Sequence, residues 1–249
     1  MSSRSWIAGL LGVSLLPLTA ATVGQAAPAG ISVESLGHSA FLISGGDGPT
    51  MLINPFKPGG CTAGLPLPAK RADLVLTSSK LLDEGYAEAV PGKPKVLDAA
   101  GAYRVGSMLL QGINMPHDRL QGRRFGPNTA WKWRQGGLTI IHLGGAAAPL
   151  SLEQQILLGQ PDVLMIPVGG GAKSYTPAEA KEAIALLKPK VVIPTMYRTK
   201  AADPKQCDLQ PLQDFLTLMK GTPVRNVGKS VTISPASLPK KGLEIDVLQ

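Results

Sequence analysis

The sequence predicts a single α/β domain built from layered sheets, and two observations support that prediction. Short apolar runs bounded by turn residues fill the first half of the chain, whereas strands and amphipathic helices alternate in the second half. No linker separates the two halves. The 249 residues, 44% of them hydrophobic, suit one large domain with a sizeable core.

The first half is predicted to be mostly strands. They are expected in ISVESLG (31–37), SAFLISGG (39–46), TMLIN (50–54), LVLT (74–77), KVLDA (95–99), MLLQGINM (108–115) and a hairpin at 128–145. The turn of that hairpin is placed at Gln135–Gly137, and a short helix is expected near Leu81–Val90. These elements would supply most of the sheet structure.

The second half is predicted to alternate helices and strands. Helices are expected in SLEQQILLGQ (151–160), YTPAEAKEAIALLKPK (175–190) and QPLQDFLTLMKG (210–221), and strands in 162–171, 191–197, 223–227 and 230–235. Thr176 with Glu179 three residues later forms a capping box, as does Ser151 with Gln154. The last ten residues are expected to be loose.

The first 26 residues predict a cleaved signal peptide. Arg4 precedes an apolar run that ends near Val23, and Gly24 and Ala26 are spaced like a signal-peptidase site. Cleavage after Ala26 would leave residues 27–249 as the mature domain, exported to a periplasm, a thylakoid lumen or the extracellular space. A membrane anchor is the alternative, but no stable span is expected once the signal is removed.

The charge balance favours anionic partners. Lys and Arg outnumber Asp and Glu by 25 to 17, so the net charge is +8. The basic residues are scattered along the chain, which is typical of a solvated basic surface. Outside the cytoplasm, nucleic acid is not expected as a partner. The expected partner is a small anionic ligand or a protein.

Several short motifs resemble one known superfamily. They are LGHSAFLI (36–43), LINPF (52–56), HDRLQGRRFGPNTAWKW (117–133), GLTIIHLGG (137–145) and the segments at 162–171 and 176–197. In this order they resemble the metallo-β-lactamase superfamily, most closely its L-ascorbate-6-phosphate lactonase-like branch, over residues 31–199. The resemblance implies an αββα sandwich: two mixed β-sheets with helices on both outer faces.

The resemblance also implies a two-metal centre that binds zinc or manganese. The residues of this chain do not match the ligands of that centre. Such metals lower the pKa of a bridging water and polarise the substrate. The family's first ligand cluster has the pattern His-x-His-x-Asp-His, and the matching positions of this chain hold other residues. The positions of the family's later acidic ligand and last histidine ligand also hold other residues. The vestigial positions are Ser78, Lys80, Leu82, Asp83, His117, Gly145 and Met196, of which only His117 keeps a ligand residue. We therefore expect an eroded site with no metal and no cofactor.

The remaining polar residues leave two roles open. His117 and Asp118 are the catalytic candidates of a site rebuilt with Asp83 and His142, whereas His38 and His142 are expected to be structural. GGGAKSY (169–175) is expected to form a turn beside the site, or alternatively a backbone cradle for an anion.

Charged residues and the two cysteines are expected around the cleft that the resemblance implies. Lys80, Arg123 and Arg124 are the candidates for anion binding there, with the Lys80 ammonium near the vacated metal position. Cys61 and Cys207 are the right count for one disulfide, and in the family fold both of their loops lie on the site side. A disulfide across the cleft mouth is thus implied, with two reduced thiols as the alternative.

The preferred interpretation is an exported pseudoenzyme that keeps the sandwich and its cleft and serves as a non-catalytic binding or accessory protein. The alternative is an active metal-dependent hydrolase of lactones or phosphoesters, with a reduced, rebuilt site around His117. Whether the chain is an enzyme stays open at this point, and the missing ligand cluster is the feature that weighs against it.

Overall fold

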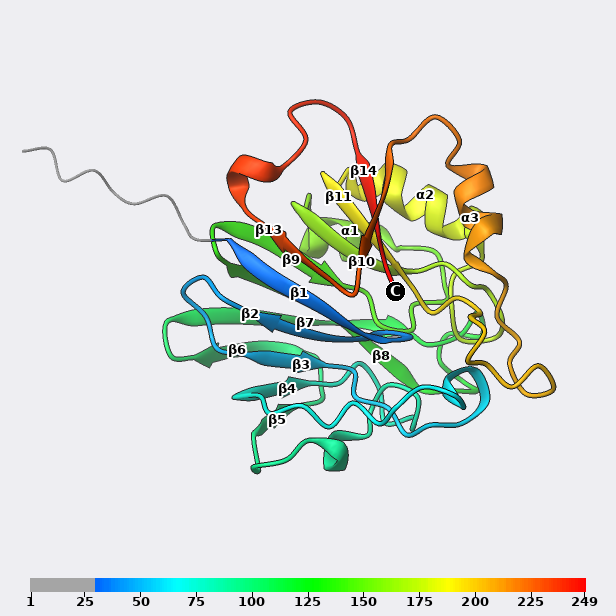
Figure 1. The fold of residues 1–249 in the computed structure, drawn as a ribbon, viewed down its shortest axis with the longest axis horizontal. Coiled ribbons are helices and arrows are strands. Elements are labelled where there is room, and N and C mark those ends of the chain that lie inside the picture. The colour runs from blue at the N-terminus through cyan, green and yellow to red at the C-terminus, as the bar shows by residue number, and fades with distance from the viewer. Residues whose placement is uncertain (1–29) are drawn as a thin grey trace, which may run out of the picture.

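Two mixed β-sheets packed face to face form the body of the protein (Figure 1). The structure is a computed structural model, and it describes residues 30–249. The predicted signal peptide therefore lies outside the described residues. No helix within this range is long and apolar enough to cross a membrane.

The first sheet has six strands in the order β13-β1-β2-β3-β4-β5. Their bounds are β1 Ile31–Gly37, β2 Ala40–Ser44, β3 Met51–Ile53, β4 Leu74–Leu76, β5 Lys95–Leu97 and β13 Ser230–Ile233. β3, β4 and β5 run parallel to one another, whereas β13, β1, β2 and β3 pair antiparallel. The short parallel strands are buried on both faces at Leu74–Leu76, as their continuous apolar sequence predicts.

The second sheet has eight strands in the order β12-β14-β11-β10-β9-β8-β7-β6. Their bounds are β6 Gly101–Val105, β7 Met108–Pro116, β8 Pro127–Gln135, β9 Leu138–His142, β10 Val163–Pro167, β11 Val191–Thr195, β12 Val224–Gly228 and β14 Glu244–Leu248. β9, β10, β11, β14 and β12 are parallel, and β6 to β9 form an antiparallel meander.

Two apolar layers hold the sandwich together. The layer between the sheets contains Trp131 and Trp133, which project from one face of β8. The other layer lies between the eight-stranded sheet and the helices α1 (Leu152–Leu158), α2 (Pro177–Leu187) and α3 (Leu212–Leu218). The αββα architecture is confirmed, although the six-stranded sheet is covered on its outer face by the single 3₁₀ turn η2 (Ala87–Ala89) and loops.

The helices form where their capping residues and apolar faces predict. Thr176 Oγ1 accepts a hydrogen bond from the Glu179 N–H, and the Glu179 carboxylate accepts from the Thr176 N–H in return, so the predicted box starts α2. Ala180, Ile184 and Leu187 lie buried on one face of α2. Ser151 and Gln154 start α1 in the same way.

Three local predictions are wrong. The segment Leu81–Val90 forms turns and only the 3₁₀ turn η2, because Gly85 in its middle disfavours a helix. A Cβ at Gly85 would lie 2.2 Å from the Ser79 carbonyl oxygen, so the turn requires glycine there. Strand β6 was not anticipated, since its mostly exposed sequence lacks an apolar pattern. The last ten residues are not loose, because β14 lies between β11 and β12 and buries Ile245 and Val247.

The topology gathers the site at one edge of the sandwich. β3, β4, β9, β10 and β11 each lead into a loop at the carboxyl end of a parallel strand, where ligand sites of layered α/β folds form. The loop after β11 meets the β1–β2 turn, since the Met196 N–H donates to the His38 carbonyl. The loop after β4 meets strand β8, since the Thr129 N–H donates to the Ser78 carbonyl. Residues far apart in sequence therefore line one cleft.

Candidate active site

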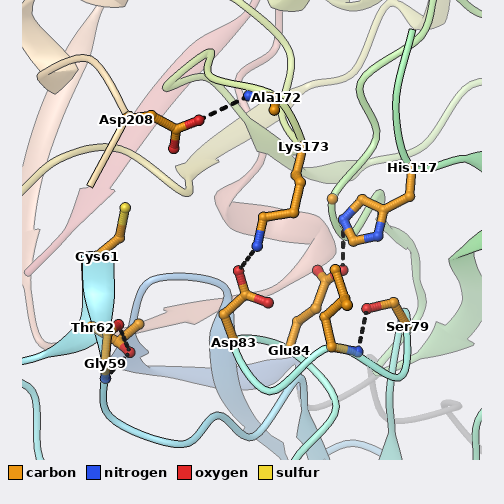
Figure 2. A network of polar contacts seen from close by, with 12 residues as sticks. Gly59, Cys61, Thr62, Ser79, Asp83, Glu84, His117, Ala172, Lys173 and Asp208 are labelled. Carbon is orange, nitrogen blue, oxygen red and sulfur yellow. Dashed lines mark hydrogen bonds and ion pairs between the residues drawn. The ribbon is translucent and has the colours of Figure 1, made fainter. Parts of the chain in front are cut away.

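A cleft of about 760 Å³ opens at this edge. Its walls come from the loops at residues 57–61, 81–83, 124–125, 172–173 and 206–209, together with His38 and Met196. Figure 2 shows part of the polar network of this region, with Asp83, Lys173 and Asp208 among the labelled residues. We refer to this feature as the cleft.

The end of β4 carries four of the vestigial ligand positions, and they point in different directions. Ser78 is buried and its N–H donates to the Asn54 side chain over 2.8 Å. Lys80 is 77% exposed and forms an ion pair with Asp98 instead of entering the cleft. Leu82 is 56% exposed. The expected placement of the Lys80 ammonium near the vacated metal position is therefore wrong.

Asp83 and Lys173 form an ion pair in the cleft (Figure 2). Burial alone would raise the pKa of the Asp83 carboxyl, but Lys173, together with His38 and hydrogen bonds, lowers it below its usual value. Asp83 is thus ionised at neutral pH. The Lys173 loop is held in place by Asp208, whose carboxylate accepts from the Ala172 N–H over 3.0 Å.

His38 lies in the turn between β1 and β2, beside Asp83. Burial is the main influence and lowers the pKa of its imidazole, so that the ring is neutral at neutral pH, while Asp83 and Glu84 act in the opposite direction. Its Nε2 is shielded from solvent and has no hydrogen-bond partner within residues 30–249. A neutral imidazole with an unused nitrogen lines the cleft.

His117, the retained family histidine, lies wholly buried behind the cleft. Its Nε2 is 2.9 Å from Glu84 Oε1, and neither side chain is exposed (Figure 2). The other carboxylate oxygen of Glu84 accepts from the Asn54 side chain over 3.4 Å. A Cβ built on Gly145 would lie 2.1 Å from His117 Nε2. The imidazole therefore occupies the space that an acidic side chain at residue 145 would need.

Asp118 shapes the loop that follows His117. Its carboxylate accepts hydrogen bonds from the N–H groups of Leu120, Gly122, Arg124 and Phe125, at 2.7, 3.0, 3.0 and 2.8 Å. Burial alone would raise the pKa of this carboxyl, but the four bonds lower it overall. Asp118 does not line the cleft. It positions Arg124 and Phe125, and its catalytic role stays a prediction.

Other cations than those expected line the cleft. Of the three candidates, only Arg124 lies there, because Lys80 and the exposed Arg123 point elsewhere. Lys57 and Lys173 complete the set. Only Lys173 of these three has a carboxylate partner among the described residues. Lys173 lies in the segment GGGAKSY, which the sequence analysis places beside the site. Nothing in that segment indicates that the Lys173 side chain enters the cleft.

The predicted disulfide is confirmed. Cys61 and Cys207 are bonded and join the turn η1 (Gly60–Thr62) to the loop after β11. Met196, the position of the family's last histidine, packs with Cys207 and Leu209 in a small apolar cluster. This end of the cleft is therefore apolar where the family has a metal ligand.

His142 is structural, as its position on β9 suggests. It is fully buried, with Nε2 3.0 Å from the Ser39 carbonyl, and its Nδ1 accepts from the Gly144 N–H over 3.0 Å. This pairing fixes the tautomer with the proton on Nε2. Burial lowers the pKa of His142 to about 4, while the Ser39 carbonyl and the charge of Glu84 act in the opposite direction.

His142 makes stability pH-dependent in a defined window. The unfolded chain, with an ordinary His pKa near 6.5, binds more protons than the folded chain between pH 6.5 and about 4. We expect the free energy of unfolding to fall by about 3 kcal/mol as the pH decreases through this window. Urea unfolding at several pH values measures the fall, and an equal fall in a His142→Asn variant would contradict this role.

The family's metal centre does not fit the residues present. Within residues 30–249, no three His, Cys, Asp or Glu side chains gather as a site that could hold a metal ion. Ser78, Gly145 and Met196 offer no imidazole or carboxylate, and Lys173 brings a positive charge to Asp83. Zinc and manganese are held by imidazole, thiolate and carboxylate ligands, so the ligand set of the family is missing here.

Comparisons with known proteins show similarity to proteins that are named hydrolases. The profile of the family described as "Beta-lactamase superfamily domain" matches residues 32–196. Two relatives, from Thermococcus onnurineus and Thermus thermophilus, are named UPF0173 metal-dependent hydrolases. The first is 28% identical over 71% of this chain and 90% of its own length, and the second 29% identical over 68% and 84%.

A solved structure agrees with these relatives. A Thermotoga maritima protein assigned as a Zn-dependent hydrolase of the metallo-β-lactamase superfamily superposes with a TM-score of 0.70. It is 29% identical and covers 88% of this chain and 100% of its own. The predicted superfamily is thereby confirmed, while the finer resemblance to the lactonase-like branch stays a prediction.

Two predictions are contradicted by these findings. The preferred interpretation of a non-catalytic pseudoenzyme is wrong, because the relatives are named hydrolases and nothing in the comparisons indicates a non-catalytic protein. Export stays a prediction. The expected lack of a cofactor is wrong for the same reason, since the relatives are named metal-dependent. With more than half of its length matched by the family profile, the chain belongs to the family of the β-lactamase superfamily domain.

Proposed function

We propose that the protein is a hydrolase of small anionic lactones or esters, acting in the cleft. The observation that carries the proposal is the neutral imidazole of His38, with its unused Nε2, next to the Asp83–Lys173 ion pair. A general base and a cation at one place are what acyl hydrolysis requires. The named activity of the relatives supports the same reaction class.

His38 is the proposed general base. Its imidazole is neutral at physiological pH, and the negative charge of Asp83 stabilises the imidazolium that forms on protonation. Because Nε2 is shielded from solvent, the proposal requires the β1–β2 turn to shift when substrate binds, so that Nε2 can take a proton from a water molecule in the cleft. The water oxygen then attacks the carbonyl carbon of the substrate. When the tetrahedral intermediate collapses, the departing alkoxide recovers the proton from His38, so that one water and one ester give an acid and an alcohol.

The cleft cations are proposed to bind charge on the substrate. Lys173 is held in the cleft by its ion pair with Asp83. From that position its ammonium can stabilise the oxyanion that develops during attack. Arg124 and Lys57, which lack a carboxylate partner in the described part of the chain, can bind an anionic substituent. Asp118 holds the Arg124 backbone through its N–H, and the guanidinium lies over the Phe125 ring at 4.7 Å from its centroid.

Hydrolysis assays on lactones, carboxylic esters and phosphoesters test the proposal. We expect His38→Gln to lower kcat by about 10²- to 10⁴-fold, the usual contribution of a general base. Arg124→Gln is expected to raise KM for anionic substrates, whereas the neighbouring Arg123→Gln, which lies outside the cleft, serves as the matched control.

Each assay should be run with zinc, with manganese and after treatment with a chelator, and metal content should be measured on the same samples. Hydrolysis that His38→Gln leaves intact would refute the role of this imidazole. No turnover of any of the three substrate classes under any metal condition would refute the proposed function.

We also propose that the protein is exported after removal of residues 1–26. The Cys61–Cys207 disulfide supports this, because disulfides persist in oxidising compartments. Periplasm, thylakoid lumen and extracellular space are all compatible with it.

A further inference from the structure

A second and larger cavity lies on the other side of His38. It has a volume of about 1200 Å³ and opens between the β1–β2 turn, the loop at 65–70, the loop after β11 and the C-terminal end of β14. We call it the groove. Among residues 30–249, His38 is the one residue that lines both the groove and the cleft, so the proposed base lies where the two spaces approach each other.

The walls of the groove are suited to an apolar chain. The sequence GLPLPAK (64–70) supplies alternating Leu and Pro residues, and Leu67 remains 44% exposed. Phe41, Leu212 and Leu248 line other parts of the wall. Proline has no backbone N–H, so the four prolines of the lining, Pro66, Pro68, Pro194 and Pro204, offer no donor to a polar ligand.

The charges around the two spaces complement an anionic molecule. At the groove, Lys70 and Lys229 share Glu34, at 3.3 and 3.5 Å. Arg198 and Lys200 line the groove without a carboxylate partner in the part of the chain that the structure describes. Arg124 in the cleft also has no carboxylate partner among residues 30–249, so both spaces carry cations that an anionic ligand can pair and a neutral apolar ligand cannot.

We infer that the substrate is an anionic ester or lactone carrying a medium or long acyl chain. The chain lies in the groove, the scissile carbonyl lies at His38, and the anionic part lies in the cleft near Arg124. This inference rests on the proposed hydrolase function and adds the substrate class. The alternative occupant, a free fatty acid bound without turnover, is an outcome of the test.

The first arm of the test measures binding without turnover. The probe is a fluorescent fatty acid, 11-(dansylamino)undecanoic acid, displaced by saturated fatty acids of increasing length. Burial of each methylene is expected to lower Kd about three- to fourfold until the groove is filled. Ala69→Trp, which adds bulk to the lining, is expected to raise Kd at least tenfold. Ala63→Trp is the matched control, since Ala63 is exposed on the same loop and lines neither space.

The second arm measures hydrolysis of acyl esters from acetate to dodecanoate. We expect kcat/KM to rise with chain length and Ala69→Trp to abolish that rise, whereas Ala63→Trp, outside both spaces, should leave the rise and acetate turnover unchanged. Turnover of short esters without any dependence on chain length would overturn the substrate class and leave the hydrolase function standing. Probe binding without hydrolysis of any ester would overturn the hydrolase function and, with it, this assignment.

Discussion

Loss of the Cys61–Cys207 disulfide is expected to lower the free energy of unfolding by about 5 kcal/mol. The two cysteines are 146 residues apart, and closing a loop of that length removes a large amount of conformational entropy from the unfolded chain. The bond also fixes the neighbouring Asp208, which holds the Lys173 loop. Urea unfolding of the Cys61→Ala/Cys207→Ala variant measures the loss.

Reduction of the wild-type protein separates the cross-link from the change in packing. The reduced wild-type chain keeps both sulfur atoms, so a loss equal to that of the double variant assigns the effect to the covalent bond. Adding reductant to the double variant should leave its free energy of unfolding unchanged. A loss below about 1 kcal/mol in both samples would contradict the entropic argument.

Gly145→Ala is expected to destabilise the fold by about 3 kcal/mol. The new Cβ would lie 2.1 Å from His117 Nε2 and 3.0 Å from Glu84 Oε1. The imidazole is fully buried, paired with Glu84 and in edge contact with Phe125, so it has no space to retreat, and overpacking of this kind costs about 1–3 kcal/mol or more. Thermal and urea unfolding measure the effect.

A double-mutant cycle shows whether His117 causes that cost. Combining Gly145→Ala with His117→Ala should remove most of the penalty relative to His117→Ala alone, because the clashing ring is gone. Gly59→Ala is the control, since no atom lies within 4 Å of a Cβ there, and it should change stability by less than about 0.5 kcal/mol. Additive effects of the two changes at residues 117 and 145 would contradict the proposed overlap.

Local sequence signals predict most of the fold. The capping boxes at Ser151 and Thr176 start α1 and α2, and the buried runs around Val75 and Met165 are strands. The disulfide was expected as well. Strand β14 was missed because a five-residue segment at a chain end becomes a strand through its neighbours, here β11 and β12.

The site was predicted less well because it depends on the directions of side chains. Lys80 follows the strand that leads to the cleft, yet its long side chain turns outward to Asp98. The cation that enters the cleft, Lys173, comes from a loop 90 residues after Asp83 and is placed by tertiary contacts with Asp208. His38 was expected to be structural, and no local pattern indicates that its Nε2 lacks a partner.

The position of β14 has a consequence for the order of folding. β14 comes last in sequence among the strands of residues 30–249, yet it is an interior strand of the eight-stranded sheet, between β11 and β12. Domains generally fold from the N-terminus as synthesis proceeds. Here β12 has no neighbour in this sheet until β14 has formed, so the native sheet can be completed only after residues 244–248 have been synthesised.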